Sequence, residues 1–481
     1  MKKFLSIILA AVMLCSFAGC NKKNSKNGKN KDTVITWLIP GDKQPGLSDV
    51  MEAANAIIKP KLGVKIDVQF IDAGAYNERM NMNMASGMEF DLCFTGYVNP
   101  YIKAVKNGGL LDITELLDKE VPELKKAIPD YAWEAVKTSE GKIYAVPNIQ
   151  VMFNVQSLEI RKEIAEKYNF DFDSVKKVTD IEPFLEMVKN GEDALFPWRT
   201  NYGTAPFMGE KYEGVQTGVS VDVDSLKVVN IYETDEYLAA VKQLNKWFKS
   251  GYIRPDVASV MSDVQDYDAG KYAVSSLSWK PGNEAVVKQS KGWDCMYVNL
   301  SEPYFSTSSA TLTLTAVSKT SKHPTEALKV IELVNTDSEL YNILSYGIEG
   351  KHYNLNKDGK IVYVPDSGYS PKAPWKFGNQ FNALLEEGQD DNVWKETEAL
   401  NKSSKKSPIL GFVFDTDPVI SEISACESVI SEYSVMKNGS ENPDVYYATF
   451  LKRLKSAGHD KIKAEVENQL SKFLKERQSE K

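Results

Sequence analysis

The residues Thr33-Val34-Ile35-Thr36-Trp37-Leu38-Ile39 form an apolar run that ends at Pro40-Gly41 and has the composition of a buried strand. Residues 47–58 carry apolar side chains at helical spacing, and Pro60 is expected to stop that helix. Residues 64–70 alternate between apolar and polar, as a strand does. A further helix fits residues 76–86 and a further strand residues 90–94. This repeated strand–helix–strand order predicts an α/β fold with a largely parallel sheet.

Ligands of such sheets bind at the carboxyl ends of the strands. We therefore expect residues 40–44, 72–75 and 95–99 to line a binding site. Asp42 lies in the first of these loops, and Tyr97 and Asn99 lie in the third. Trp37, on the first strand, either reaches the same site or packs in the core.

The first twenty residues indicate export. Lys2 and Lys3 precede an apolar run that is too short to span a bilayer, so residues 1–19 are predicted to be a signal peptide. The ending Ala-Gly-Cys resembles the bacterial lipobox, which implies acylation of Cys20 and attachment to the extracellular face of the cell membrane. The alternative is a cleaved signal with a chance cysteine. Residues 20–32, rich in lysine and asparagine, are expected to form a flexible tether.

Composition excludes several classes of function. The chain has 481 residues and a formal charge of −8. Binding to nucleic acid favours a basic surface, so nucleic acid is not an expected partner. Its length predicts at least two cores. Beyond the signal and Cys20 only Cys93, Cys295 and Cys426 remain, so a disulfide framework is not expected, although one pair stays open.

Six motifs occur in an order that resembles the family 1 extracellular solute-binding proteins of bacterial ABC importers. They are Tyr76-Asn77-Glu78-Arg79 with Ala85-Ser86-Gly87-Met88-Glu89-Phe90-Asp91, Gly109-Leu110-Leu111-Asp112, Gly141-Lys142-Ile143-Tyr144-Ala145-Val146-Pro147, Gly251-Tyr252-Ile253-Arg254-Pro255-Asp256, Ala269-Gly270-Lys271-Tyr272-Ala273, and residues 321–336. The C-terminal part, about residues 345–481, resembles the region called DUF3502 in the LplA-like lipoproteins of that family. Two closing helices there are expected to pack on the second lobe.

The resemblance implies a two-lobe, type 2 periplasmic-binding-protein-like fold with a hinge. The first lobe would comprise residues 33–148 and 307–365, and the second residues 149–306 and 366–481. A solute held between the lobes would be delivered to the transmembrane subunits of an ABC permease when the hinge closes. ATP hydrolysis would belong to the permease complex, since this chain has no phosphate-binding loop motif.

Most members of that subgroup are assigned to oligosaccharide uptake, and sugars need aromatic faces for stacking together with polar partners for their hydroxyls. Trp279 follows a strand where the family often places a stacking aromatic, with packing in the core as the alternative. Trp247, on an apolar helical stripe, is expected in the core. Further candidates near the lobe crossings or in glycine-containing loops are Gln150, Asn154, Trp198, Arg199, Glu284 and Glu349.

Two other classes of protein stay open. A lipoprotein glycoside hydrolase needs two carboxylates at a defined separation. Because the chain has 66 acidic residues, the sequence alone does not show whether such a pair is present. A sensor or adhesin would share the fold and the anchor. The histidines at positions 323, 352 and 459 form no metal-binding motif. We therefore expect a monomeric, non-enzymatic binding protein without metal or cofactor, whose partners are an oligosaccharide or other small solute, a permease and the bilayer.

Overall fold

The computed structural model describes residues 32–138 and 140–479. The predicted signal peptide, Cys20 and nearly all of the tether lie outside the described residues. Within these two ranges no helix combines the length and the apolar character needed to cross a membrane. The cores and cavities described below all lie in residues 34–138 and 140–479, which belong to one compact unit.

The first sheet contains the strands that the N-terminal pattern predicted. Its order is β2 (Val64–Ile71), β1 (Thr33–Pro40), β3 (Leu92–Gly96), β13 (Thr313–Val317) and β4 (Ala145–Pro147). Strands β1 and β3 are parallel, whereas β13 is antiparallel to both of its neighbours. Thr313 at the start of β13 lies opposite Gly96 at the end of β3. The chain therefore enters β13 at the edge where β3 ends, so the sheet is mixed and less parallel than predicted.

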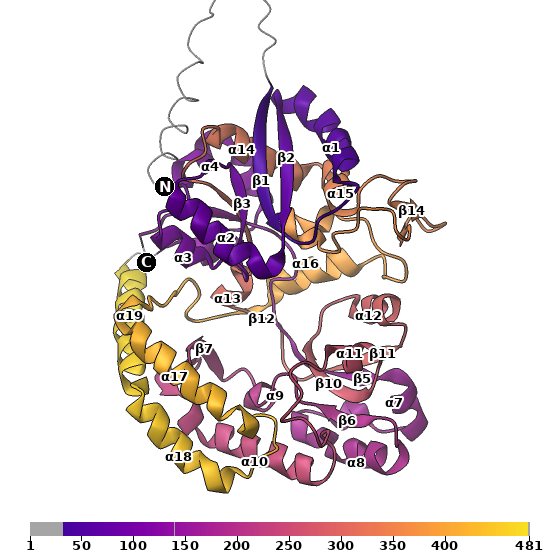
Figure 1. The fold of residues 1–481 in the computed structure, drawn as a ribbon, viewed down its shortest axis with the longest axis vertical. Helices are drawn as coiled ribbons and strands as arrows, with labels where there is room; N and C mark the ends of the chain where they lie inside the picture. Colours follow the sequence, from indigo (N-terminus) through magenta and orange to yellow (C-terminus); the bar gives the residue numbers. More distant parts are fainter. Residues whose placement is uncertain (1–31, 139, 480–481) are drawn as a thin grey trace, which may run out of the picture. The chain divides into compact units, whose positions relative to one another are not determined.

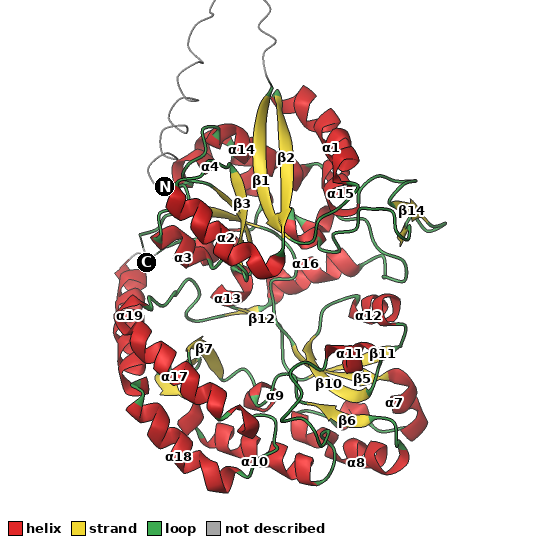
Figure 2. Ribbon diagram, in the orientation of Figure 1, coloured by secondary structure: helices red, strands yellow, loops and turns green. Residues whose placement is uncertain are grey.

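Helices flank this sheet (Figures 1 and 2). They are α1 (Leu47–Leu62), α2 (Ala73–Ser86), α3 (Tyr101–Lys106), α4 (Thr114–Glu120), α5 (Pro122–Ala127), α6 (Asp130–Val136), α13 (Thr307–Ala310), α14 (Pro324–Thr336) and α15 (Ser338–Tyr346). The prediction that Pro60 stops α1 is wrong, because the helix continues to Leu62. Only two helical residues follow Pro60, so the proline disturbs little more than the last turn. The left-handed Gly63, with φ of 73°, ends the helix instead.

The second sheet has the order β11 (Cys295–Asn299), β5 (Gln156–Arg161), β10 (Tyr272–Ser278) and β6 (Phe196–Arg199). Strand β5 is antiparallel to β10 and β11, while β10 and β6 are parallel. Around it are α7 (Lys162–Tyr168), α8 (Glu182–Gly191), α9 (Ala205–Met208), α10 (Asp235–Lys249), α11 (Val264–Asp268) and α12 (Asn283–Lys291). Trp247 on α10 is fully buried, which confirms its predicted place in the core.

A third sheet carries the C-terminal helices. It consists of β7 (Tyr212–Gln216), β8 (Val219–Asp222) and β9 (Val228–Asn230), and the helices are α17 (Ile420–Glu432), α18 (Pro443–Ser456) and α19 (His459–Ser479). Phe450, Leu454 and Val466 share one core with Val219 and Val241. The expectation that two closing helices pack on the second lobe is thereby confirmed.

The segment that follows α15 packs against the core of the first sheet. It contains the two-stranded sheet of β14 (Tyr353–Leu355) and β15 (Ile361–Tyr363), followed by α16 (Val393–Ser403). Phe377 and Ala383 are buried in the core of the first sheet, and Trp394 packs against it. Residues 374–394 therefore pack with the first lobe, although the sequence analysis assigned them to the second. The remaining lobe limits stay a prediction.

In the described part of the chain three segments connect the two lobes, and we call residues 148–155, 303–306 and 404–411 the crossing segments. Asn154 and Tyr304 exchange backbone hydrogen bonds of 2.8 and 2.9 Å. Strand β12 (Tyr304–Phe305) pairs in parallel with β16 (Lys405–Lys406). The three crossing segments thus lie side by side, an arrangement that a hinge requires.

The three cysteines of the described chain are free and buried. Cys93 lies on β3, Cys295 on β11 and Cys426 on α17. Each belongs to a different part of the fold, so the disulfide that the sequence left open is not formed.

Candidate functional site

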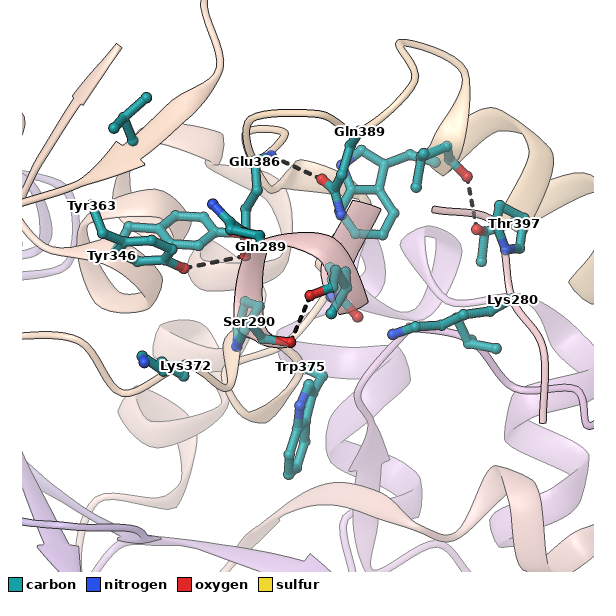
Figure 3. Close-up of a pocket in the computed structure, with 18 residues that line it drawn as sticks. Lys280, Gln289, Ser290, Tyr346, Tyr363, Lys372, Trp375, Glu386, Gln389 and Thr397 are labelled. Atoms are coloured by element: carbon teal, nitrogen blue, oxygen red, sulfur yellow. Dashed lines mark hydrogen bonds between the residues drawn. The ribbon is translucent and has the colours of Figure 1, made fainter. Parts of the chain in front are cut away.

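A cavity of about 560 Å³ lies between α12 with its preceding loop and the segment from Tyr346 to Thr397 (Figure 3). A volume of this size is typical of sites for small organic ligands. Lys280, Gln289 and Ser290 contribute from the second lobe, whereas Tyr346 and Trp375 contribute from elements packed on the first. Both lobes therefore supply walls to one cavity, which we call the main cavity.

Aromatic side chains form one part of the main cavity. Trp375 is half-buried, and its ring meets those of Phe94 and Tyr97 edge to face, with centroids 6.2 and 5.7 Å apart. Tyr97, predicted as a ligand contact, is 50% exposed. Trp394 lines the cavity farther along and donates its indole hydrogen to the carbonyl of Ala383 at 2.8 Å. Such half-exposed rings can stack on the C–H faces of a sugar.

Polar groups also line the main cavity. Tyr363 donates its phenol hydrogen to Glu386 Oε1 at 3.1 Å, and the amide oxygen of Gln389 accepts from the Glu386 backbone at 2.8 Å (Figure 3). Burial raises the pKa of Glu386 and lowers that of Lys280, and the opposite charge of each partly offsets the effect on the other. The main cavity therefore offers both hydrogen-bond donors and acceptors beside its aromatic rings.

A second cavity, of about 290 Å³, adjoins the crossing segments. Asn154, another predicted contact, lines it together with Tyr202 and Ser278. Trp279 stands between the two cavities along the chain, since Ser278 lines the second and Lys280 the main one. The indole of the half-buried Trp279 donates to Glu284 Oε1 at 3.3 Å, which brings these two predicted residues together.

A third cavity, of about 510 Å³, lies at the carboxyl ends of β1 and β2. Asp42 and Lys43 line it with Asp72 and Arg79, so the loops 40–44 and 72–75 meet as expected. Asp42 is exposed there. The side chain of Lys376 donates to the carbonyl of Pro40 at 2.6 Å, which ties this loop to the segment that carries Trp375.

Several predicted residues have structural contacts. Trp37 and Trp198 are each 1% exposed and lie in the cores of the first and second lobes. Arg199 is buried, and its guanidinium makes two 2.8 Å hydrogen bonds to Asp263 and lies 4.1 Å from the ring centroid of Tyr267. The guanidinium charge of Arg199 is therefore paired within the second lobe.

The other predicted polar residues have different surroundings. Asn99 is 2% exposed, and its side chain donates to the carbonyl of Phe94. Gln150 is half-buried on a crossing segment and donates to Thr313 Oγ1 at 2.8 Å. Glu349 is exposed in the turn before β14. The structure thus groups Tyr97 with Trp375 and Trp279 with Glu284.

The sequence analysis missed Trp375, Glu386, Gln389 and Trp394. A signal was present, because Gly368, Pro374, Gly378 and Gly388 mark a long loop that carries aromatic side chains. Loops of this kind commonly carry binding residues. Within the described ranges no cluster of three or more His, Cys, Asp or Glu side chains could hold a metal ion.

Known proteins resemble the chain over most of its length. Residues 408–475 match the model of the domain of unknown function DUF3502. A carbohydrate ABC transporter substrate-binding protein of Streptococcus pneumoniae serotype 4 is 28% identical over 479 residues, which cover 97% of this chain and 96% of the relative. Lipoprotein LipO of Bacillus subtilis is 24% identical over 77% of this chain and 76% of its own length.

Solved structures agree with these matches. The crystal structure of the N-glycan transport solute binding protein NgtS from Streptococcus pneumoniae has a TM-score of 0.83 at 27% identity and covers 92% of this chain and 99% of that chain. Structures of NgtS in complex with Man1GlcNAc and Man5GlcNAc have TM-scores of 0.74 and 0.70 at the same 92% coverage of this chain. The predicted resemblance and the two-lobe solute-binding fold are confirmed. The Streptococcus pneumoniae relative and NgtS are substrate-binding and solute-binding proteins, in agreement with the prediction that the chain is not an enzyme.

Proposed function

We propose that this chain, which resembles substrate-binding proteins of carbohydrate ABC transporters over nearly its whole length, binds an oligosaccharide between its two lobes and delivers it to a membrane permease. The main cavity carries this proposal. Its walls come from both lobes, and it places the rings of Trp375 and Trp394 beside the polar groups of Lys280 and Glu386. Aromatic faces next to hydrogen-bonding groups are what sugar rings need.

The relatives support the choice of ligand. NgtS has been crystallised with Man1GlcNAc and with Man5GlcNAc. The chain matches these two complexes less well than it matches the other NgtS structure, at equal coverage of this chain. The glycan-bound NgtS conformations therefore differ from the conformation described here. Such a difference supports a hinge motion about the crossing segments when a glycan binds.

The binding residues proposed for this site line a cavity or adjoin residues that line one. Trp279, Tyr97, Glu284 and Asn154 come from the sequence analysis, and Asp42 would contribute from the third cavity. Trp375, Glu386, Gln389 and Trp394 are added by the structure. Hydroxyl groups that lose water in the cleft need such partners, because each unpaired buried group costs about 1–3 kcal/mol.

We also propose attachment to the extracellular face of the cell membrane through acylated Cys20, with the chain acting as a monomer. The lipobox-like ending of the signal supports this, as does the similarity to the lipoprotein LipO. An anchor of two acyl chains holds a protein stably on a bilayer. The tether would then keep the binding lobes at high local concentration near the permease.

The test is calorimetric titration of the protein with Man1GlcNAc and Man5GlcNAc, followed by analysis of the recovered sugar. Saturable binding with the glycan recovered intact is the expected result. At a ligand concentration of about 100 times the dissociation constant, the free energy of unfolding should rise by about 2.7 kcal/mol. Cleavage of the glycan would instead identify a glycoside hydrolase, and absence of binding would remove the proposed ligand class.

A further inference from the structure

The main cavity contains an ammonium group that has no protein partner. Lys280 extends from the loop between β10 and α12 into the cavity (Figure 3). In the described part of the chain no carboxylate pairs with its Nζ, and no oxygen accepts a hydrogen bond from it. Burial opposes its charge and lowers its pKa. An ammonium group can donate three hydrogen bonds, so Lys280 has unused donors directed at whatever fills the cavity.

A carboxylate with a free acceptor faces the same space. Glu386 Oε1 accepts from the Tyr363 phenol at 3.1 Å, while Oε2 accepts no hydrogen bond from the described residues. The backbone of Glu386 is held by Gln389, which fixes the start of the side chain. Lys280 and Glu386 attract each other electrostatically but do not form an ion pair. The cavity thus separates a group that only donates from a group that only accepts.

Resting on the proposed function, we propose that Lys280 and Glu386 together make this site selective for neutral saccharides. A neutral sugar can satisfy both groups, because one of its hydroxyls can accept from the ammonium and another can donate to the carboxylate. A neutral acetamido group likewise offers a carbonyl that accepts and an N–H that donates. A carboxylate on the ligand would pair with Lys280 but would be repelled by Glu386. An amine on the ligand would pair with Glu386 but would be repelled by Lys280.

The other nearby cation does not remove this selectivity. Lys372 also lines the cavity and attracts Glu386, but its side chain is exposed. Water and salt therefore screen its charge, whereas Lys280 and Glu386 interact in a partly dehydrated space.

The two selective groups come from different lobes. Lys280 belongs to the second lobe, and Glu386 lies in the segment that packs with the first. One ligand that bonds to both groups would hold the lobes together. Selection for a neutral group and closure of the hinge would then depend on the same contacts.

The experiment compares two matched sugars by calorimetric titration. One is Man1GlcNAc, and the other is the same disaccharide with the C6 hydroxymethyl of mannose oxidised to a carboxylate. The variants are Lys280→Met, which removes the charge at similar length, and Glu386→Gln, which keeps an acceptor for Tyr363. Lys288→Met is the control, because Lys288 lies exposed on α12 and pairs with Asp294 at 2.6 Å. Thermal unfolding of each variant checks that it is folded.

We expect the unmodified protein to bind the neutral disaccharide at least about tenfold more tightly than the acidic one. Lys280→Met should weaken binding of the neutral disaccharide about tenfold or more, and Glu386→Gln should narrow the difference between the sugars, while Lys288→Met changes neither. Equal or tighter binding of the acidic sugar would overturn this inference and leave the proposed function standing. Full affinity in Lys280→Met would overturn it as well. If the unmodified protein bound neither sugar, the proposed function itself would fail.

Discussion

The carboxylate of Glu213 accepts a hydrogen bond from the phenol of Tyr304 at 2.8 Å. The same oxygen, Oε2, accepts from Ser407 Oγ at 2.5 Å. Glu213 lies on β7 in the second lobe, whereas Tyr304 and Ser407 lie on two different crossing segments. One carboxylate therefore fixes two of the three crossing segments to the second lobe. The hinge must then bend between these hydrogen bonds and the first lobe, or the hydrogen bonds must break.

Glu213→Gln should loosen the hinge. A hydrogen bond to a charged group contributes about 1.5–3 kcal/mol, and the amide replaces two such bonds by weaker ones. We expect a small loss in the free energy of unfolding and a change in the radius of gyration, measured by small-angle X-ray scattering with and without Man5GlcNAc. Glu236→Gln is the matched control. Glu236 binds Tyr212 and Lys211 within the second lobe at 3.1 and 2.6 Å. An equal scattering change in both variants would contradict a specific role of Glu213 in the hinge.

Asn401→Ala should destabilise the first lobe. The Asn401 side chain is fully buried, donates to the carbonyl of Gln150 at 2.6 Å and accepts from the amide of Met152 at 2.9 Å. Its removal leaves two buried backbone groups without partners, each at a cost of about 1–3 kcal/mol. Denaturant unfolding should show the loss. Asn401→Asp keeps the acceptor for Met152 and loses the donor, so a value as high as that of the unmodified protein would show that the Gln150 bond contributes nothing.

Trp279→Ala should weaken glycan binding by about 1–3 kcal/mol and leave the unfolding temperature nearly unchanged. The ring is half-buried, and its chain neighbours Ser278 and Lys280 line the second and the main cavity, so it has surface available for a sugar. Trp247→Ala provides the contrast, because that ring is fully buried and its loss should cost about 3–5 kcal/mol of stability. Intact affinity with a large loss of stability in Trp279→Ala would assign Trp279 to the core.

Stability should fall below about pH 6.5, partly through His459. The imidazole is 1% exposed, lies 3.0 Å from the carbonyl oxygen of Thr217 and has a pKa lowered by burial. The unfolded chain therefore takes up a proton before the folded chain does, so the contribution of His459 is complete above the unfolded pKa and declines as pH falls through it. His459→Gln should flatten the stability profile between about pH 5 and 7, as measured by denaturant unfolding. An unchanged slope would assign the acid sensitivity to other groups.

Periodicity predicted the regular elements because their burial is one-sided. The apolar residues that recur at helical spacing on α18 and α19 lie in one core, as Phe450, Leu454 and Val466 show. The position of Pro60 misled the helix prediction because a proline in a last turn removes few contacts.

The tryptophans show where local pattern stops being informative. Trp37 and Trp279 both stand next to loops, yet the first is buried and the second is half-exposed. Which side of a strand is covered depends on distant segments, here Phe377, whose ring lies 5.8 Å from that of Trp37. The main cavity depends on the same long-range packing, since it brings the loop at Lys280 to Trp375 and Glu386. The residues next to Lys280, Trp375 and Glu386 in the sequence do not indicate that contact.

The three buried cysteines give this protein its own set of kinetic probes. Burial raises the pKa of Cys93 and of Cys295 to about 12 and that of Cys426 to about 11. Thiolate is the reactive form, so all three should be silent toward alkylating reagents while the fold is intact. Cys93 reports on the first sheet, Cys295 on the second and Cys426 on the C-terminal helices. Mass-spectrometric labelling rates would then show whether these parts open separately or together, and which of them a bound glycan slows.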